Sequence, residues 1–572
     1  MGKRVAREIW EYDSIDDFDT DSGSEKYGPG NVYIGGQAHR NLIRKGLENA
    51  AWNTAAINDA LKYGDVGLTI PGLFFINAGI RIPDNKELYL GKRAHYKLAP
   101  GQRNNIITTE GYINPDYTVI GLTSTGTTCT AVLSDTDFAN LGVVAGDYVA
   151  LNWAKPQFYA GVFQVMSVDD VTNSIVYKTF KVPANATASP GTGGAIKIRR
   201  ATYRPRLVVD GLLDYDSVNQ SGSGSNSVLH AVIMSHAFEP VLDGTFVKAL
   251  KYNTLLACTS FAKVPRFISG GQSDGLHITG PAWFPAIGVV EGDNSDNLFA
   301  AGAGDYAAYH ISEGAIVGCT VDLVVADSPN IDAVRVWGTQ DYSVDVEIGE
   351  VGGHCVSTIG AVQLISDASV LPDGNSWVAN FEIKKCSITE TGALVVNSNA
   401  AKLDRLSLTP DYPLTSPAAS QSFLRLRGCA QGVGIVEING GLFGGAASSK
   451  LVDLFSGLAA DLKINLNNVR AGGAWGVNNN TTRNAIVQTN NCEFSALTNT
   501  VRATGASGSN KLFSASCIHP ATTMTRTSTA TLEAYGFDIK LPNTTNMALI
   551  NGQHANVADA LQITKGGAWS AV

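Results

Sequence analysis

Short apolar segments recur along this chain at intervals of roughly two dozen residues. The equivalent positions are Val321 and Val344, Phe381 and Leu406, and Leu462 and Ile486. A repeat of this length corresponds to one coil of a solenoid, in which each coil buries its apolar face only by stacking on its neighbours. No leucine-rich or tryptophan-aspartate consensus accompanies the repeat, so we expect the coils of a parallel β-helix. A two-sheet sandwich or a propeller with similar spacing is the alternative.

The composition favours many short strands joined by tight turns. The 572 residues include 60 glycines, and only 16% of the chain is charged. Asparagines at 467–468, 478–480 and 490–491 are expected at turns, because asparagine tolerates a left-handed backbone. The sequence therefore predicts a mainly β protein.

The N-terminal segment 1–48 is polar and rich in glycine at its centre, so it buries little apolar surface on its own. We interpret residues 1–48 as an N-terminal attachment arm. The next segment, 49–64, has helical spacing of its apolar residues and ends in glycine, which predicts one amphipathic helix. Its apolar residues are Trp52, Ala56, Ile57, Ala60 and Leu61.

Three short strand segments are predicted directly after this helix, at 66–72, 79–83 and 86–91. A capping helix followed by TIPGLFFINAGIRIPDNKELYLG resembles the opening of the pectate-lyase-like β-helix proteins, a superfamily that includes phage tailspikes. Here Gly-Leu-Phe-Phe stands where that superfamily usually has Gly-Thr-Tyr after the proline. The resemblance implies a right-handed parallel β-helix, with the capping helix and first coils in 49–113 and the main body, carrying a glycan-binding groove, in 201–520.

Residues 114–200 show a different pattern, with well-spaced strands separated by polar turns, as is typical of a small antiparallel barrel. The strands predicted there are 131–133, 147–151, 161–165 and 174–177. We interpret this segment as a small β-barrel-like domain inserted between coils. Beyond about residue 520 the repeat fades, so 521–572 are expected to form a C-terminal cap or trimerisation region.

The charge of the chain argues against two classes of partner. The formal net charge is −9, the sequence pI is near 5.5, and the basic residues are scattered. A nucleic acid or an anionic membrane would require a basic stripe. No run of 18 apolar residues is present, and the first thirty residues lack the apolar centre of a signal peptide. We expect no nucleic-acid partner, no membrane insertion, and folding in a cytoplasm.

Eight cysteines occur singly, without a Cys-x-x-Cys motif and without a Cys/His cluster at zinc-ligand spacing. We expect reduced thiols packed in the core. The sequence contains no nucleotide-binding loop, zinc-protease motif or serine nucleophile elbow. It therefore predicts neither a metal site nor a cofactor.

Three aspartates in mid-chain are the candidate catalytic residues. Glycoside hydrolysis needs one carboxylic acid to protonate the leaving oxygen and one carboxylate to activate water or attack carbon. Residues about one coil apart lie one above the other on a solenoid face. The steps from Asp274 to Asp293 and from Asp274 to Asp296 are both close to one coil. The alternative is that these carboxylates only solvate exposed turns.

Aromatic and polar residues near these aspartates are candidates for binding a sugar chain. They are Trp283, Phe284, Asp305, Tyr306, Tyr309, His310, Arg335 and Trp337. The stretch resembles the polygalacturonase-like glycoside hydrolases of the same fold, which carry Asn-Thr-Asp, a paired Asp about one coil later, Gly-His-Gly and Arg-Ile-Lys. The counterparts are Ser273-Asp274-Gly275, then Asp293 or Asp296, then His310, then Arg335. Here two residues separate the paired aspartates, and Trp337 stands where the lysine would be.

These resemblances imply a phage tailspike depolymerase that binds and cleaves a bacterial surface polysaccharide, either capsule or O-antigen, by glycoside hydrolysis. Asp293 and Asp296 would be acid and base, with Asp274 assisting. The expected assembly is a homotrimer in the virion, joined to the phage tail or an adaptor protein through residues 1–48. It would be made in the host cytoplasm and act at the bacterial surface.

Two other functions remain open at this point. A polysaccharide lyase would use Tyr309 or His310 as base, with Arg335 neutralising a uronate carboxylate. A non-catalytic virion adhesin would bind the glycan without cutting it.

Overall fold

A computed structural model describes most of the chain. The described residues are 32–35, 37–39, 42–191, 194–220, 229–271, 274–305, 309, 311–328, 332–355, 361–365, 376–388, 396–398, 402–410, 413–415, 422–426, 434–444, 450–454, 462–480, 484–503, 509–518, 524–526, 531–537 and 556–557. The chain forms two compact units. The first takes its described residues from 1–327 and 338–344, and the second from 328–337, 345–367 and 375–572.

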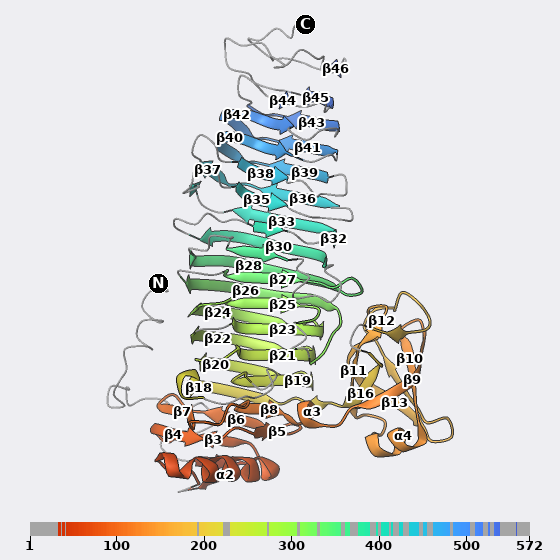
Figure 1. Ribbon diagram of the computed structural model, residues 1–572, viewed down its shortest axis with the longest axis vertical. Helices are drawn as coiled ribbons and strands as arrows, with labels where there is room; N and C mark the ends of the chain where they lie inside the picture. Colours follow the sequence, from red (N-terminus) through yellow and green to blue (C-terminus); the bar gives the residue numbers. More distant parts are fainter. Residues whose placement is uncertain are drawn as a thin grey trace. The chain divides into compact units, whose positions relative to one another are not determined.

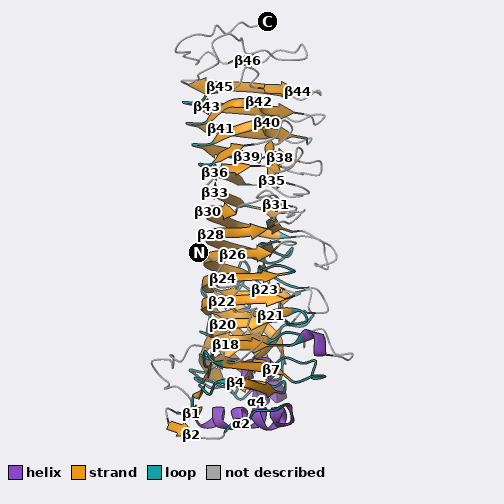
Figure 2. Ribbon diagram, turned by 90° about the vertical axis from the view of Figure 1, so that its left-hand side faces the viewer, coloured by secondary structure: helices purple, strands orange, loops and turns teal. Residues whose placement is uncertain are grey.

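A helix covers the first coil of the first unit, as predicted. Helix α2 (Ala50–Tyr63) packs on strands β4 (Gly72–Ile76) and β5 (Ile80–Ile82), and Figure 2 shows it lying across their end of the unit. The amide of Asn53 donates to the carbonyl of Phe75 over 2.9 Å. Helix α2 thus satisfies polar groups that the open end of a solenoid would otherwise expose.

One residue of the helix differs from the prediction. Ile57, Ala60 and Leu61 are buried, but Trp52 is 50% exposed, although its spacing placed it on the apolar face. The guanidinium of Arg44 lies 4.3 Å from the centre of the Trp52 ring, on the outside of the helix. Asn53 takes the inward position instead, because its side-chain amide donates to the carbonyl of Phe75 in the first coil and to that of Arg44, which precedes the helix.

Part of the predicted attachment arm is described. Strand β1 (Val32–Ile34) pairs antiparallel with β2 (Gln37–His39) and with β3 (Val66–Leu68) of the first coil, and the 3-10 turn η2 (Leu47–Asn49) leads into α2. Residues 1–31 of that arm lie outside the described residues.

The first coils contain three strands each. Strands β3, β4 and β5 pair in parallel with β6 (Glu87–Leu90), β7 (Ala94–Leu98) and β8 (Ile107–Thr109). Val66 pairs with Leu88, its equivalent one coil further along the chain. A strand that pairs with its equivalent in the next coil is the defining feature of a parallel β-solenoid. The predicted mainly β solenoid is therefore confirmed, with strands at 80–82 and 87–90 as expected. The strand predicted at 66–72 ends at Leu68, and Gly72 begins the separate strand β4.

The coils resume after the insertion and form continuous parallel ladders (Figure 1). The remaining solenoid elements of the first unit are β17 (Thr202–Tyr203), β18 (Arg206–Asp214), the 3-10 turn η3 (Ser217–Asn219), β19 (Val232–Phe238), β20 (Val241–Val247), β21 (Tyr252–Ser260), β22 (Lys263–Gly271), β23 (Asp274–Trp283), β24 (Ala286–Asn294), β25 (Phe299–Gly302) and β26 (Ile316–Ser328). Met234, Leu256, Ile278 and Ala301 are neighbours in successive coils and all are buried. Columns of this kind form the core of the solenoid.

A small closed barrel interrupts the coils between β8 and β17, as predicted. Its strand order is β10-β14-β13-β11-β16-β9. The elements of the insertion are α3 (Glu110–Ile113), β9 (Tyr117–Thr125), β10 (Thr128–Leu133), α4 (Asp135–Leu141), β11 (Tyr148–Asn152), β12 (Ala154–Lys155), β13 (Gly161–Asp169), β14 (Ser174–Lys178), β15 (Ser189–Pro190) and β16 (Lys197–Arg200). The amide of Asn152 lies 2.9 Å from Nε2 of His236, which fixes barrel strand β11 to solenoid strand β19.

The second unit continues the parallel pairing, with strands stacked in successive layers (Figure 2). Its strands are β27 (Val334–Trp337), β28 (Ser343–Cys355), β29 (Val362–Leu364), β30 (Trp377–Ile388), β31 (Val396–Ser398), β32 (Lys402–Leu403), β33 (Arg405–Pro410), β34 (Pro413–Thr415), β35 (Ser422–Leu426), β36 (Ile435–Asn439), β37 (Leu442–Gly444), β38 (Lys450–Leu454), β39 (Leu462–Asn467), β40 (Arg470–Asn479), β41 (Ala485–Asn490), β42 (Glu493–Ala503), β43 (Ser509–Ala515), β44 (Met524–Arg526), β45 (Thr531–Phe537) and β46 (Asn556–Val557). Strand β28 begins in the first unit. Strand β45 pairs with β43 along its whole length, so the coils extend past residue 520, where the sequence repeat faded.

Several details of the repeat can be compared with the prediction. Phe381 pairs with Leu406, as their spacing indicated, whereas Leu462 pairs with Ala485, one residue before the predicted partner. Asn468 and Asn491 have positive φ angles of 56° and 51°, as expected for turns. The asparagines at 478 and 479 instead end strand β40, so that part of the turn prediction is wrong.

The described cysteines are free and buried, as predicted, while Cys429 lies outside the described residues. Across the part of the chain that the structure describes, no helix is long and apolar enough to cross a membrane.

Candidate functional site

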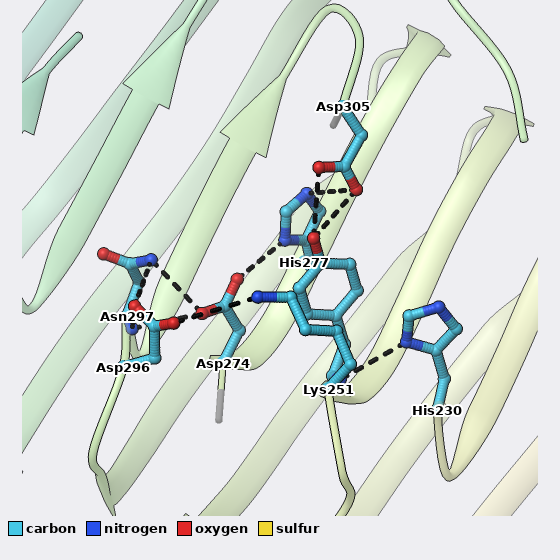
Figure 3. Close-up of polar contacts among 8 residues, drawn as sticks. His230, Lys251, Asp274, His277, Asp296, Asn297 and Asp305 are labelled. Atoms are coloured by element: carbon cyan, nitrogen blue, oxygen red, sulfur yellow. Dashed lines mark hydrogen bonds and ion pairs between the residues drawn. The ribbon is translucent and has the colours of Figure 1, made fainter. Parts of the chain in front are cut away.

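A column of polar residues lies at the start of β23 in the first unit. His230, Tyr252, Asp274 and Asn297 follow one another, each about one coil after the previous one. Tyr252 and Asp274 are direct partners in the ladder of β21 and β23. The backbone N–H of Tyr252 donates to Nδ1 of His230 over 3.3 Å, and Nδ2 of Asn297 donates to Oδ1 of Asp274 over 3.2 Å (Figure 3). The stacking of coils therefore places these polar groups in register.

Four buried residues form what we call the inner cluster: Tyr252, Asp274, His277 and Asp305. Nδ1 of His277 lies 2.9 Å from Oδ2 of Asp274, and Nε2 of the same ring lies 3.7 Å from Oδ2 of Asp305. The Tyr252 hydroxyl donates to both oxygens of Asp305, over 3.1 and 2.9 Å. These residues are between 1% and 3% exposed. One imidazole ring thus lies between two buried carboxyl groups.

Two aromatic neighbours of this imidazole are neutral. Burial, followed by the charge of Asp305, raises the pKa of Tyr252 well above its ordinary value, so its hydroxyl remains a donor. Burial lowers the pKa of His230 to about 3, so this ring can accept the backbone N–H of Tyr252. The Tyr252 ring stacks between both imidazoles, with its centre 4.0 Å from that of His277 and 4.7 Å from that of His230.

Four residues at the outer side of the inner cluster are called the rim: Lys251, Asp296, Asn297 and Tyr309. Lys251, Asp296 and Tyr309 are partly exposed, whereas Asn297 is buried beneath them. The side chain of Asp296 is 36% exposed and that of Lys251 is 20% exposed, with Nζ 4.0 Å from Oδ2 of Asp296. Nδ2 of Asn297 donates to Oδ1 of Asp296 over 3.1 Å. The ammonium of Lys251 also lies 4.9 Å from the centre of the Tyr309 ring.

The charge on Lys251 is stabilised by its neighbours. Burial alone would lower the pKa of Lys251, but the carboxylates of Asp274 and Asp296 outweigh burial and raise it. The rim therefore presents a cation and a carboxylate together, with the buried amide of Asn297 fixing the carboxylate, as a site for a polar substrate does.

Asp293 has a different environment from Asp296, three residues later. It lies on β24 beside Gly270 of β22, and the chain bends between the two aspartates. Burial, and then the carboxylate of Asp327, raises the pKa of Asp293 above its ordinary value of 3.8. Its Oδ1 is buried without a hydrogen-bond partner among the described residues. A carboxyl group in such surroundings favours the protonated form.

The two tryptophans predicted to stack on sugar are in the wrong place for that role. Trp283 is 1% exposed and packs against Phe158, Phe163 and Phe180 of the inserted barrel. Trp337, on β27, is 2% exposed. Neither ring offers a face to a substrate at the surface, because large apolar rings are most stable when packed in a core.

The remaining predicted residues fall into four groups. Asp305 and Tyr309 belong to the site, the first in the inner cluster and the second on the rim, while Phe284 is half-buried at the barrel. Arg335 belongs to the second unit, where its guanidinium lies 5.8 Å from the centre of the Trp337 ring, so it is not part of the described cluster. Ser273, Tyr306 and His310 lie outside the described residues.

The sequence prediction missed His230, Lys251, Tyr252, His277 and Asn297. The signal that could have found two of them is the same spacing that related Asp274 to Asp296. Counting back from Asp274 in steps of one coil leads to Tyr252 and then to His230. In the described parts of the chain, no three His, Cys, Asp or Glu side chains are arranged to hold a metal ion.

Comparison with known proteins gives weak similarities. No family model and no curated protein matches the chain. Among solved structures, the tailspike protein gp49 from Pseudomonas phage LKA1 is 12% identical with a TM-score of 0.34, covering 84% of this chain and 76% of that one. The tailspike gp61 of Pseudomonas phage phi297 is 9% identical with a TM-score of 0.27, covering 87% of this chain and 75% of that one. At these TM-scores the superpositions assign no activity, and the solenoid is established by its own strand pairing.

Proposed function

We propose that this protein is a bacteriophage tailspike that binds a bacterial surface polysaccharide and cleaves it by glycoside hydrolysis. The observation that carries the proposal is the contrast between two carboxyl groups three residues apart. Burial raises the pKa of Asp293, whereas Asp296 lies among an ammonium group and amide donors. A pair of carboxyl groups in opposite environments is the arrangement that divides acid and base roles in glycosidases.

In this mechanism Asp293 is the general acid and Asp296 is the carboxylate. Asp293 would donate its proton to the leaving glycosidic oxygen, and Asp296 would either activate water or attack the anomeric carbon. Lys251 and Asn297 hold Asp296, and the partly exposed Lys251 contacts the sugar chain, with Tyr309 offering a ring face at the rim. Asp274 assists through Asn297 without contacting substrate, since it is buried. The chemistry requires no metal or organic cofactor.

The assembly that accompanies this function is a homotrimer of right-handed parallel β-helices in the virion. A solenoid has a long lateral face, and a closed symmetric oligomer covers such a face. The arm at 1–48 would attach each chain to the phage tail or an adaptor protein. Monomeric behaviour in light scattering would contradict the trimer.

The test is a screen of the purified protein on lawns of diverse encapsulated bacteria, followed by mass spectrometry of the products. Asp293→Asn and Asp296→Asn should each lower turnover by roughly 10² or more, because each removes a proton-transfer group while keeping shape. Asp170→Asn, at an exposed turn of the barrel, is the matched control and should keep full activity. Wild-type turnover in both site variants would remove Asp293 and Asp296 from the mechanism.

A lyase mechanism is the second candidate, favoured by the contact between Lys251 and Tyr309. The ammonium of Lys251 would neutralise a uronate carboxylate, and the Tyr309 oxygen would accept the proton from the carbon beside that carboxylate. A C=C bond forms as the C–O bond to the glycosidic oxygen one carbon further on breaks, and that oxygen leaves with a proton from solvent. Unsaturated uronate absorbance in the products would select this mechanism. Binding without any product across the panel would identify a non-catalytic adhesin.

A further inference from the structure

An open hollow lies where the inserted barrel meets the solenoid, inside the first unit. Its volume is about 830 Å³, which is within the range of sites that hold small molecules. The barrel and the ends of solenoid strands β19 and β23 both contribute to its walls. The residues that line it include Tyr148, Gln164, Lys178, Phe180, Phe238 and Phe284.

Two rings at this hollow come from the same turn of successive coils. Phe261 and Phe284 have φ angles of 57° and 53°, and their rings stack with centres 5.5 Å apart. This left-handed backbone region is strained for a bulky side chain. Neither ring is fully buried, so packing recovers only part of that cost. Strain of this kind is typical of functional sites, and here it holds two aromatic rings at the edge of the solenoid.

Three further rings extend this pair. Phe180 of the barrel is 36% exposed, and its ring centre lies 5.1 Å from that of Phe261 and 5.8 Å from that of Phe284. Phe238 lies 5.5 Å from Phe261, and Tyr148 lies 4.4 Å from Phe238. We call these five rings the aromatic shelf. A sugar ring presents a face of C–H groups, which packs well on the electron-rich face of an aromatic ring.

The edge of the hollow is polar and positively charged. The side chains of Gln164 and Lys178 are exposed there, and Lys178 is the charged one among the described residues that line the hollow. The carboxylate of Glu239, which acts on Tyr148, is already paired with the guanidinium of Arg204 over 2.6 Å. An apolar peptide or a lipid would cover the ammonium and the amide without giving them partners. The hydroxyl and carboxylate groups of an acidic sugar would satisfy both.

We propose that this hollow is a second glycan-binding site, which takes an acidic polysaccharide chain with its sugar faces on the aromatic shelf and a carboxylate at Lys178. The identity of the polymer rests on the function proposed above, but binding here does not require hydrolysis. Asp274 begins β23 and Phe284 follows its last residue, so at about 3.3 Å per residue the two sites lie up to about 30 Å apart. A long polymer can contact both sites, which strengthens its binding.

The test measures binding of purified acidic and neutral capsular polysaccharides by surface plasmon resonance, in an Asp296→Asn background that leaves the polymer intact. Phe180→Leu and Phe284→Leu keep an apolar side chain but remove the aromatic face, so each should weaken binding of the acidic polymer by up to about tenfold. Phe180→Tyr keeps that face and should bind as the parent does. Tyr63→Leu, at an aromatic residue of α2 that is 78% exposed, is the matched control and should change nothing.

The charge is tested with the same polysaccharide after chemical reduction of its carboxyl groups. The parent should bind the reduced polymer more weakly than the native one. Lys178→Gln should bind both forms equally, because it removes the cation and keeps a hydrogen-bond donor. Equal binding of both forms by the parent would contradict the acidic ligand.

The remaining outcomes separate this site from other roles of the hollow. Parent-like affinity in Phe180→Leu, Phe284→Leu and Lys178→Gln would overturn the second site. So would a loss of affinity that only follows a lowered thermal transition, or a changed oligomeric state in light scattering with sugar binding intact, which would make the hollow a contact between copies. If these variants bind less and the protein with Asp296 intact cleaves no polysaccharide, hydrolysis fails while the second site stands.

Discussion

The indole N–H of Trp283 donates to the carbonyl oxygen of Ala160 over 2.9 Å, which joins the last residue of β23 to the inserted barrel. Phe163 and Phe180 pack against the same ring, with centres 6.2 and 5.3 Å away. A Cβ on Gly161 would overlap the indole, so the barrel backbone approaches it closely. Trp283 therefore belongs to the junction of barrel and solenoid.

Trp283→Ala should destabilise that junction by about 3–5 kcal/mol, because it removes a large buried ring and leaves a cavity. Trp283→Phe should destabilise the junction less, since the variant keeps an aromatic ring and loses chiefly a hydrogen bond worth about 0.5–1.5 kcal/mol. The measurement is the thermal transition of the barrel, followed by limited proteolysis. Trp52→Ala, at a half-exposed tryptophan, is the control. Equal effects in Trp283→Ala and Trp52→Ala would contradict the junction role.

The left-handed turns of the second unit give a second prediction. Asn491 has a φ of 51°, and its amide donates to Oδ1 of Asn468 over 2.8 Å. Asn491→Val should cost about 1–2 kcal/mol, because a branched side chain is strained in this backbone region. Asn491→Gly should be nearly neutral, since glycine accepts positive φ. Asn480→Val, at an exposed asparagine outside the left-handed region, should have the smaller effect in denaturant unfolding.

The repeat and its turns were predictable because they depend on local chemistry. Apolar residues one coil apart must be neighbours in a solenoid, which is why Phe381 and Leu406 could be paired from the sequence. The register error of one residue at Leu462 has a physical cause as well. Turn lengths vary between coils, and only the three-dimensional ladder fixes which residue comes next.

The site was less predictable because its members come from several successive coils. Asp274 and Asp296 were found by spacing, and Asn297 does connect them. The inward or outward direction of a ring is set by packing, so the burial of Trp283 under an inserted barrel could not be deduced from its neighbours in the sequence. His277 was passed over because a histidine inside a strand gives no sequence signal of two carboxylates beside it.

The buried ring of His230 predicts a loss of stability in acid. Its folded pKa of about 3 lies below its ordinary value of 6.5, so between these values the unfolded chain binds a proton that the folded chain does not. Stability should therefore fall as pH decreases from about 6.5 towards 3. His230→Gln keeps an acceptor for the N–H of Tyr252 and should flatten this slope, measured as unfolding midpoints against pH. His236, whose pKa burial also lowers, should contribute with the same sign. If the variant that carries both His230→Gln and His236→Gln kept the same dependence of stability on pH, the prediction would be contradicted.

The raised pKa of Asp293 predicts the opposite dependence of stability on pH. A substitution at this position also separates an effect on stability from an effect on catalysis. Because burial raises its folded pKa above 3.8, the folded chain holds a proton more tightly than the unfolded chain, so stability is lost as pH rises through the raised value. Asp293→Asn should then be more stable than the parent at pH 7, with the difference vanishing below about pH 3.8, while turnover falls.

Asp169→Asn is the control, because the pKa of Asp169 is shifted in the opposite direction. Backbone N–H groups of Val171 and Thr172 lower the pKa of Asp169. Asp169→Asn should therefore destabilise the folded protein at pH 7 and leave its stability unchanged in strong acid. The stability of both variants is measured as the urea midpoint of unfolding at a series of pH values. A less stable Asp293→Asn at pH 7 would show that this carboxyl is not held in a protonating environment, and the general-acid role would then pass to another group.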